Sequence, residues 1–120
     1  MTKTPHLTVE IAEEERGTLV TVAGDLDYDS SPRLQAALDG LRLGADRVLV
    51  LDLAGLTFFD SSGVTVLIVA RKLALAAGAS IAVSALTPMV AKIFRITGLD
   101  QVFPCYPDAG AALAHPPADA

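Results

Sequence analysis

Residues 48–77 constrain the fold more than any other part of the chain. They begin with Val48–Leu51, which is apolar at every position, and end in a long, mostly apolar helical segment. A strand without a polar face that leads into a helix is typical of the centre of a parallel sheet covered by helices. The two are joined by Asp60-Ser61-Ser62-Gly63 (the DSSG turn), where Asp and Ser are the usual caps of a helix N-terminus.

Strand and helix patterns alternate along the rest of the chain. Alternating or β-branched apolar segments predict strands at residues 7–12, 18–23, 47–53, 80–84 and 102–106. Start and stop signals predict helices from a serine cap at Ser30-Ser31-Pro32 to near Gly44, from the DSSG turn to Ala77, from Thr87 to Gly98, and at residues 108–114. A charged turn at residues 13–17 and a loop at residues 24–29 separate the first elements.

The order β-β-α-β-α-β-α-β-α predicts the topology. The first two strands form an antiparallel hairpin, and strands that alternate with helices pair in parallel through right-handed crossovers. We therefore expect a single α/β domain at residues 1–115, with helices and a mixed, mostly parallel β-sheet. Residues 116–120 are expected to form a disordered C-terminal tail.

Composition excludes several classes of protein. The chain has 120 residues and a net charge of −5, and its Lys and Arg residues are scattered, which disfavours nucleic-acid binding. Cys105 is the single cysteine and is expected in the core, so no intramolecular disulfide forms. No uncharged apolar run approaches the roughly 20 residues of a membrane span, and residues 1–5 lack the apolar segment of a signal peptide. A cytoplasmic protein without membrane insertion is expected.

The DSSG turn offers hydroxyls but no visible catalytic machinery. Ser61 or Ser62 as a nucleophile lacks a GxSxG motif, and neither His6 nor His115 lies in a segment expected to reach the turn. A metal site or an acid–base pair could use the four aspartates near the turn, which are Asp25, Asp27, Asp29 and Asp60. Aspartates in loops, however, are more often solvated turn residues. Walker and GxGxxG phosphate loops are absent. We expect no enzyme, no metal and no cofactor. The serines either cap the helix, which is the commoner use, or accept a phosphate that a helix N-terminus favours.

The helix after the DSSG turn is apolar on nearly all sides. Helical spacing places these residues on the face toward the sheet: Val66, Val69, Ala70, Leu73 and Ala77. The outer side then holds Val64, Thr65, Ile68, Arg71, Lys72 and Leu75. Apolar residues bracketed by charges either form an interaction surface or lie under a neighbouring helix, and the sequence leaves both interpretations open.

In combination, these motifs resemble the anti-sigma factor antagonists of bacteria, which are single-domain members of the STAS family. The resemblance covers residues 7–114. It rests on Gly24-Asp25-Leu26-Asp27, Ser31-Pro32-Arg33-Leu34, Leu51-Asp52-Leu53, Phe58-Phe59 with the DSSG turn, Thr87-Pro88-Met89-Val90, Ile93-Phe94 and Gly98-Leu99. It implies a STAS-like fold. The chain departs from the family at Val64-Thr65, where relatives often have Leu-Gly.

The resemblance also implies a mechanism. The unmodified protein binds an anti-sigma factor that is also a serine kinase, and this frees the sigma factor. The kinase phosphorylates the serine directly after the Asp of the motif, here Ser61. The phosphoprotein then dissociates, and a serine phosphatase resets it. The alternative is a STAS module without a phosphorylation cycle, acting as a scaffold in a signalling assembly or as a subunit of a lipid-transport complex.

The partner is expected to dock around the DSSG turn. Loops that leave the carboxyl ends of parallel neighbouring strands meet at one edge of a sheet, so the Asp25 loop should lie beside this turn. The expected partner-binding residues are Asp25, Asp27, Tyr28, Asp60, Ser62, Gly63, Val64, Thr65 and Ile68.

Overall fold

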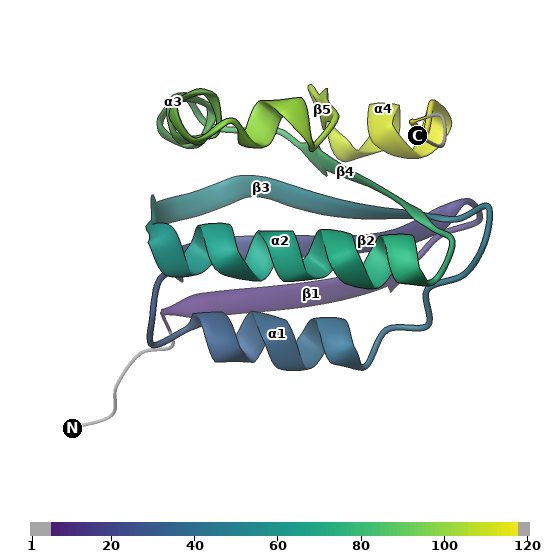
Figure 1. The fold of residues 1–120 in the computed structure, drawn as a ribbon, viewed down its shortest axis with the longest axis horizontal. Coiled ribbons are helices and arrows are strands. Elements are labelled where there is room, and N and C mark those ends of the chain that lie inside the picture. Colours follow the sequence, from purple (N-terminus) through teal and green to yellow (C-terminus); the bar gives the residue numbers. More distant parts are fainter. Residues whose placement is uncertain (1–5, 118–120) are drawn as a thin grey trace.

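The computed structural model describes residues 6–117, and its sheet is built around the strand that the sequence places at the centre (Figure 1). The strands are β1 (Leu7–Glu13), β2 (Gly17–Leu26), β3 (Val48–Phe59), β4 (Ser80–Ser84) and β5 (Cys105–Tyr106). They lie in the order β1-β2-β3-β4-β5. β1 pairs antiparallel with β2, and the other neighbours pair in parallel. The predicted mixed, mostly parallel sheet is therefore confirmed.

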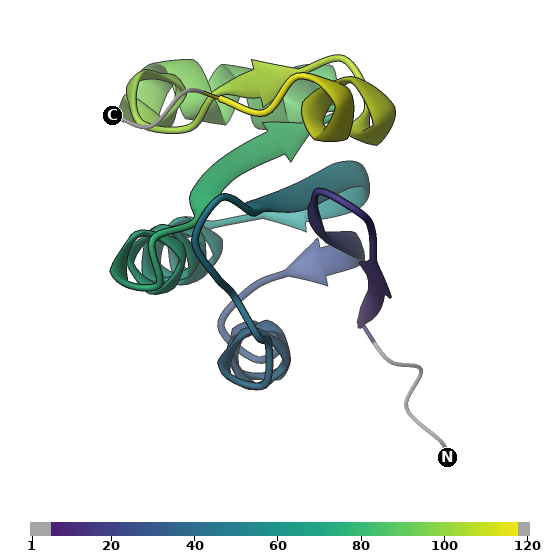
Figure 2. The same cartoon turned by 90° about the vertical axis from the view of Figure 1, so that its right-hand side faces the viewer.

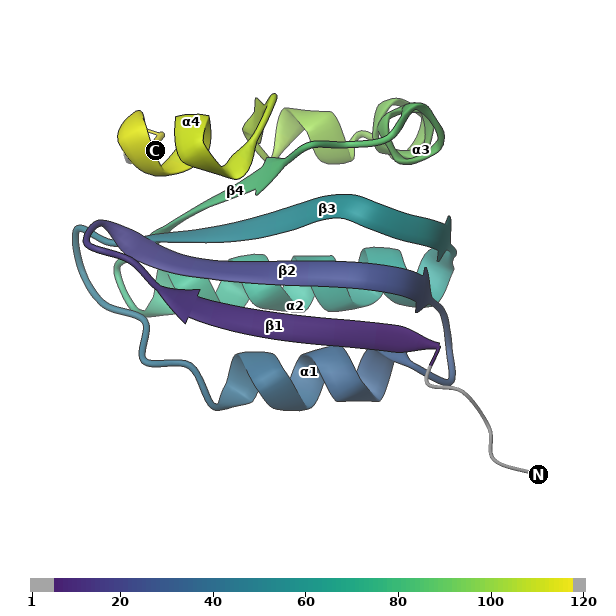
Figure 3. The same cartoon turned by 180° about the vertical axis from the view of Figure 1, so that it is seen from behind.

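The helices cover the two faces of the sheet unequally. They are α1 (Ser31–Asp39), α2 (Ser61–Ala76), α3 (Pro88–Thr97), the 3₁₀-helix η1 (Leu99–Gln101) and α4 (Ala109–Ala114). α1 and α2 lie side by side on one face, as two perpendicular views show (Figure 1 and Figure 2). α4 packs on the opposite face, where Ala112 joins an apolar cluster with Val48 and Val50. Seen from behind, no helix of residues 6–117 lies in front of β1 and β2 (Figure 3).

The order of strands and helices agrees with the sequence prediction, with η1 added. The predicted C-terminal tail is not tested by the described residues. Residues 118–120 lie outside the described part of the chain, so the domain boundary after residue 115 and the disorder of the tail stay predictions.

β2 and β3 are both longer than the sequence predicts. They remain paired as far as Leu26 and Phe59, so much of the predicted loop at residues 24–29 and the loop before the DSSG turn are strand. Two register shifts, opposite Thr21/Ala23 and Gly24/Asp25, place the extra residues on β3, where the buried residues Leu53, Leu56 and Phe59 are three apart rather than two. Because such bulges interrupt the two-residue period, the pattern ends before the strand does.

The other boundary corrections concern α1 and β5. α1 ends at Asp39 with Gly40 as its C-cap, so the prediction of a helix to near Gly44 was wrong. Leu41 lies beyond the helix, half-buried against the core, although its spacing fits the helical stripe. β5 has two residues rather than five, because η1 and a turn occupy the residues before it.

The buried face of α2 differs from the predicted one. The residues that are buried are Gly63, Val66, Leu67, Ala70 and Ala74. Val69, Leu73 and Ala77, which the sequence places toward the sheet, are half-buried at the side of this stripe. A helix that is apolar nearly all round does not specify which stripe faces the core, so packing decides it.

Cys105 is exposed, and the prediction of a core cysteine was wrong. The reason is its position on β5, a two-residue strand at the edge of the sheet. Although the residue is at the surface, its sulfur is partly shielded. This shielding and the nearby carboxylate of Asp100 raise the pKa of the thiol. A raised pKa keeps the thiol protonated at neutral pH and makes it a weak nucleophile.

Candidate functional site

Two loops meet at the carboxyl ends of β2 and β3. The two strands are parallel neighbours, and Leu26 at the end of β2 lies opposite Phe59 at the end of β3. The backbone N–H of Asp60 donates to the carbonyl of Leu26 over 3.4 Å. The loop after β2 and the DSSG turn therefore lie side by side, as we expected from the chain order.

The DSSG turn is capped by its aspartate. Asp60 is the N-cap of α2, and its Oδ1 accepts hydrogen bonds from the backbone N–H groups of Ser62 (2.9 Å) and Gly63 (3.3 Å). Ser61 is the first residue of α2 and is exposed, and its carbonyl accepts from the Thr65 hydroxyl at 3.1 Å. Because Asp60 already caps the helix, the Ser61 side chain is not needed for this purpose.

Gly63 is buried beneath the turn and lets α2 start close to β3. A Cβ atom at this position would lie 2.6 Å from two ring carbons of Phe59 and 3.2 Å from Leu26 Cδ2. The Phe59 ring packs in turn against Phe94, with ring centroids 6.2 Å apart. Gly63 therefore helps to position Ser61 and Ser62 through its close packing on β3, and it is too buried to form a contact surface itself.

The loop after β2 is held by hydrogen bonds between Asp27 and Ser30. The Ser30 hydroxyl donates to the Asp25 carbonyl (2.6 Å) and accepts from the Asp27 N–H (2.9 Å), while the Ser30 N–H donates to Asp27 Oδ1 (3.0 Å). This backbone N–H, together with the Ser30 hydroxyl, lowers the pKa of Asp27 below its ordinary value. Ser30 stands at the N-cap of α1, and its carbonyl accepts from the Arg33 N–H at 2.9 Å, but its side chain accepts no capping hydrogen bond, so the predicted cap by the serine side chain was wrong.

Further polar side chains come from the end of β2 and from the loop after it. Asp25 Oδ1 accepts from the Thr57 hydroxyl at 2.8 Å, and Asp25 Oδ2 lies 3.8 Å from His6 Nδ1. Tyr28 is 79% exposed, although large aromatic side chains are usually buried at least in part. Aromatic residues exposed beside polar groups are enriched in protein interfaces.

The outer side of α2 is open in the described structure. Ile68 and Leu75 are 38% and 47% exposed, so no neighbouring helix of the described residues covers them. Val64 is half-buried against the core, and Thr65 is exposed. Arg71 does not project freely, because its Nε donates to the Val102 carbonyl at 3.3 Å. Of the two interpretations of this side, exposure therefore favours the interaction surface at Ile68 and Leu75.

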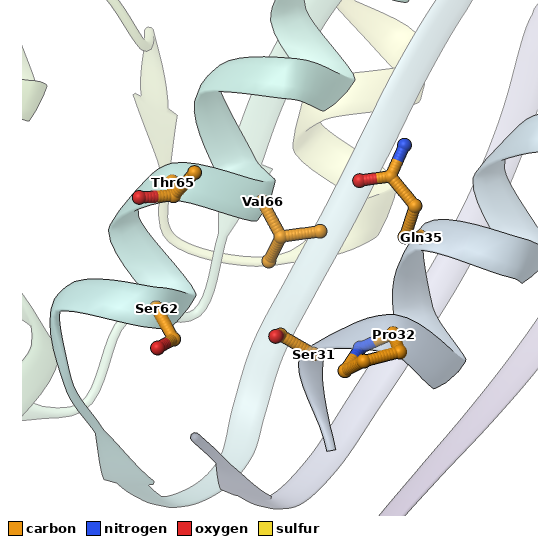
Figure 4. A pocket seen from close by; sticks show the side chains of 6 residues that line it. All are labelled: Ser31, Pro32, Gln35, Ser62, Thr65 and Val66. Carbon is orange, nitrogen blue, oxygen red and sulfur yellow. The ribbon is translucent and has the colours of Figure 1, made fainter. Parts of the chain in front are cut away.

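The structure adds residues that sequence reasoning missed. A pocket of about 230 Å³ lies between the first two turns of α1 and α2 (Figure 4). Its lining residues are Ser31, Pro32, Gln35, Ser62, Thr65 and Val66. Only Ser62 and Thr65 belong to the predicted partner surface. The α1 residues were missed because nothing in the sequence indicates that α1 and α2 begin side by side.

Residues 6–117, the described part of the chain, offer neither a metal-binding cluster nor a membrane-spanning helix. They contain no group of three or more His, Cys, Asp or Glu residues that could hold a metal ion. They also contain no helix long and apolar enough to cross a membrane. The site as built presents an exposed hydroxyl beside a carboxylate, with apolar residues on the adjoining helix.

The sequence of most of the sheet and helices matches a known domain. Residues 9–104 match the family model described as "Mlab, STAS domain". The chain belongs to the STAS family. In this family, the anti-sigma F factor antagonist of Paenibacillus polymyxa is 31% identical over 110 residues, covering 90% of this chain and 93% of the relative.

Several solved structures share this fold over nearly the whole chain. An anti-sigma factor antagonist from Mycobacterium paratuberculosis has a TM-score of 0.82 at 26% identity, covering 95% of this chain and 97% of that one. The anti-sigma factor antagonist SpoIIAA in its unphosphorylated form has a TM-score of 0.70 at 19% identity, covering 93% and 100%. The Bacillus SpoIIAA structure in the phosphorylated form has a TM-score of 0.63 at 17% identity, covering 87% and 96%. The predicted STAS-like fold is thus confirmed.

Proposed function

We propose that this STAS protein is an anti-sigma factor antagonist regulated by phosphorylation of Ser61. In its unmodified form it binds an anti-sigma factor with serine kinase activity and releases the sigma factor. Phosphorylation of Ser61 ends this binding, and a serine phosphatase restores it. The protein acts by binding rather than by catalysis.

The observation that best supports this proposal is the exposure of Ser61 at the start of a helix that Asp60 already caps. A kinase can therefore reach the hydroxyl, and its modification removes no cap. Ser62 is half-buried whereas Ser61 is exposed, so Ser62 is the poorer acceptor. The names of similar proteins support the same kind of switch: one relative is an anti-sigma F factor antagonist, and SpoIIAA has been solved in an unphosphorylated and a phosphorylated form.

Electrostatics explains how the modification ends binding without unfolding the domain. A phosphate adds a charge of about −1.5 to −2 at pH 7, and a helix N-terminus tolerates this charge. On Ser61, however, the phosphate would stand beside the carboxylate of Asp60, which already accepts hydrogen bonds from backbone N–H groups in the first turn of α2. A partner that fits closely around Ser61 then meets a second negative charge and a bulky group.

Phosphopeptide mapping tests the acceptor. The purified protein is incubated with ATP and candidate anti-sigma kinases, with Ser61→Ala and Ser62→Ala as matched variants. We expect phosphate on Ser61 in the wild type and in Ser62→Ala, and none in Ser61→Ala. Modification confined to Ser62, Ser30 or Thr65 would contradict the assignment.

Calorimetric binding to the same kinase tests the switch. Ser61→Ala should bind like the wild type, whereas Ser61→Asp should bind at least tenfold more weakly. Ser61→Asn has nearly the same shape as aspartate without its charge and serves as the control. Equal affinities for the Asp and Asn variants would show that charge at this position does not regulate binding, as expected of a STAS scaffold without a phosphorylation cycle.

A further inference from the structure

The pocket between α1 and α2, hereafter the notch, is built from the first two turns of both helices (Figure 4). Val66 on α2 points toward α1 and is only 3% exposed, so it forms an apolar wall. Pro32 adds its ring from the other side. The hydroxyls of Ser31 and Ser62 and the amide of Gln35 lie around these apolar groups. None of the six lining residues carries a charge.

Size and polarity restrict what the notch can hold. Its volume of about 230 Å³ lies below the roughly 300–1,000 Å³ of sites that enclose small-molecule ligands. A charged group would lose water here without an opposite charge among the lining residues to compensate. The occupant that fits is therefore one uncharged, mainly apolar side chain.

The notch is continuous with the surface around Ser61. Ser62 and Thr65 line the notch and also belong to the expected partner-binding residues. Ser61 directly precedes Ser62 and is exposed. A partner that covers the Ser61 hydroxyl therefore lies within one residue of the notch. Protein interfaces commonly place an apolar anchor in a small pocket near their centre, surrounded by polar groups.

We propose that the notch receives an apolar side chain of the anti-sigma factor kinase that docks on Ser61. This inference rests on the proposed function and extends it: the N-terminal part of α1, at Ser31, Pro32 and Gln35, becomes part of the partner surface. It also adds a reason for release on phosphorylation. A strongly hydrated phosphate on Ser61 stands beside the notch and opposes the entry of an apolar group.

Filling the notch from the α1 side tests the proposal. Gln35→Phe places a ring in the notch without altering Ser61 or any residue of α2. Ala36→Phe adds the same ring at the next position, which is exposed and does not line the notch. Calorimetry with the kinase that phosphorylates Ser61 should show at least tenfold weaker binding for Gln35→Phe and a change of less than twofold for Ala36→Phe. Thermal unfolding of both variants shows whether the fold is intact.

The outcomes separate this inference from the proposed function. If the wild type binds the kinase and Gln35→Phe binds equally well with an intact fold, the notch is not a docking pocket and the Ser61 switch still stands. Equal weakening by both variants would likewise overturn the notch, because the effect would not depend on filling it. Failure of the wild type to bind any anti-sigma kinase overturns the proposed function and this inference with it. If Gln35→Phe destabilises the fold, Gln35→Leu provides the same comparison with a smaller side chain.

Discussion

Alanine at position 63 tests whether the DSSG turn needs glycine for packing. The added Cβ would lie 2.6 Å from two ring carbons of Phe59 and 3.2 Å from Leu26. The Phe59 ring has little room to move, because it is buried and packs against Phe94. Overfilling a packed core costs about 1–3 kcal/mol. The better helix propensity of alanine offsets about 0.5–1 kcal/mol. We expect Gly63→Ala to lower the free energy of unfolding by about 1–2 kcal/mol.

Urea denaturation followed by circular dichroism measures this loss. Gly110→Ala is the matched control, because the nearest atom to its added Cβ is Asp108 Oδ1 at 3.4 Å. On α4 the same substitution should be neutral or should stabilise the protein by up to about 1 kcal/mol. In thermal unfolding, Gly63→Ala should lower the Tm by about 4–8 °C. If Gly63→Ala is as stable as the wild type while Gly110→Ala behaves as expected, α2 does not start as close to β3 as the argument requires.

Three further changes test the surroundings of Ser61. Asp60→Ala removes the cap of α2 and should cost about 0.5–2 kcal/mol in urea denaturation, so an unchanged midpoint would show that the cap is dispensable. The pKa of Asp27 is lower in the folded state than its ordinary value. Its charged form therefore stabilises the fold at pH values above the unfolded-state pKa, and this contribution is lost as the pH falls through the folded-state pKa. Asp27→Asn should therefore destabilise more at about pH 7 than at about pH 3, and urea curves with the same difference at both pH values would refute this. Ile68→Glu should weaken kinase binding more than tenfold, about 1.4 kcal/mol, at unchanged Tm, whereas Leu75→Glu two turns farther from Ser61 should not. Equal losses for both variants in calorimetry would place the contact elsewhere.

Local patterns in the sequence were sufficient to predict most elements. Thr87 accepts a hydrogen bond from the Val90 N–H at the start of α3, and Gly98 ends the helix in the left-handed conformation, as the residue types indicate. The strand at Ser80–Ser84 was predicted with the boundaries that the structure has. These features depend on residues close together in the chain, so their sequence preferences suffice.

The errors lie where distant segments decide the outcome. The length of β2 and β3 depends on pairing beyond two bulges. The exposure of Cys105 depends on β5 lying at the sheet edge. One error is local instead: Asp27 and Ser30 were expected as a loop residue and a cap, but they bond to each other across a turn of three residues. Of the candidate site, the position of Asp60 and Ser61 followed from the motif, whereas the notch did not.

The sequence by itself determined the strand–helix order, the parallel sheet and the start of α2 at the DSSG turn, because hydrophobic periodicity and capping are local properties. Only the tertiary structure decided which stripe of α2 is buried and that Ser61 stays exposed above a packed glycine. It alone decided that α1 and α2 open a notch between their first two turns. These features depend on how one helix is rotated and seated against the sheet and its neighbour. For a helix that is apolar on nearly every side, packing rather than pattern sets that rotation.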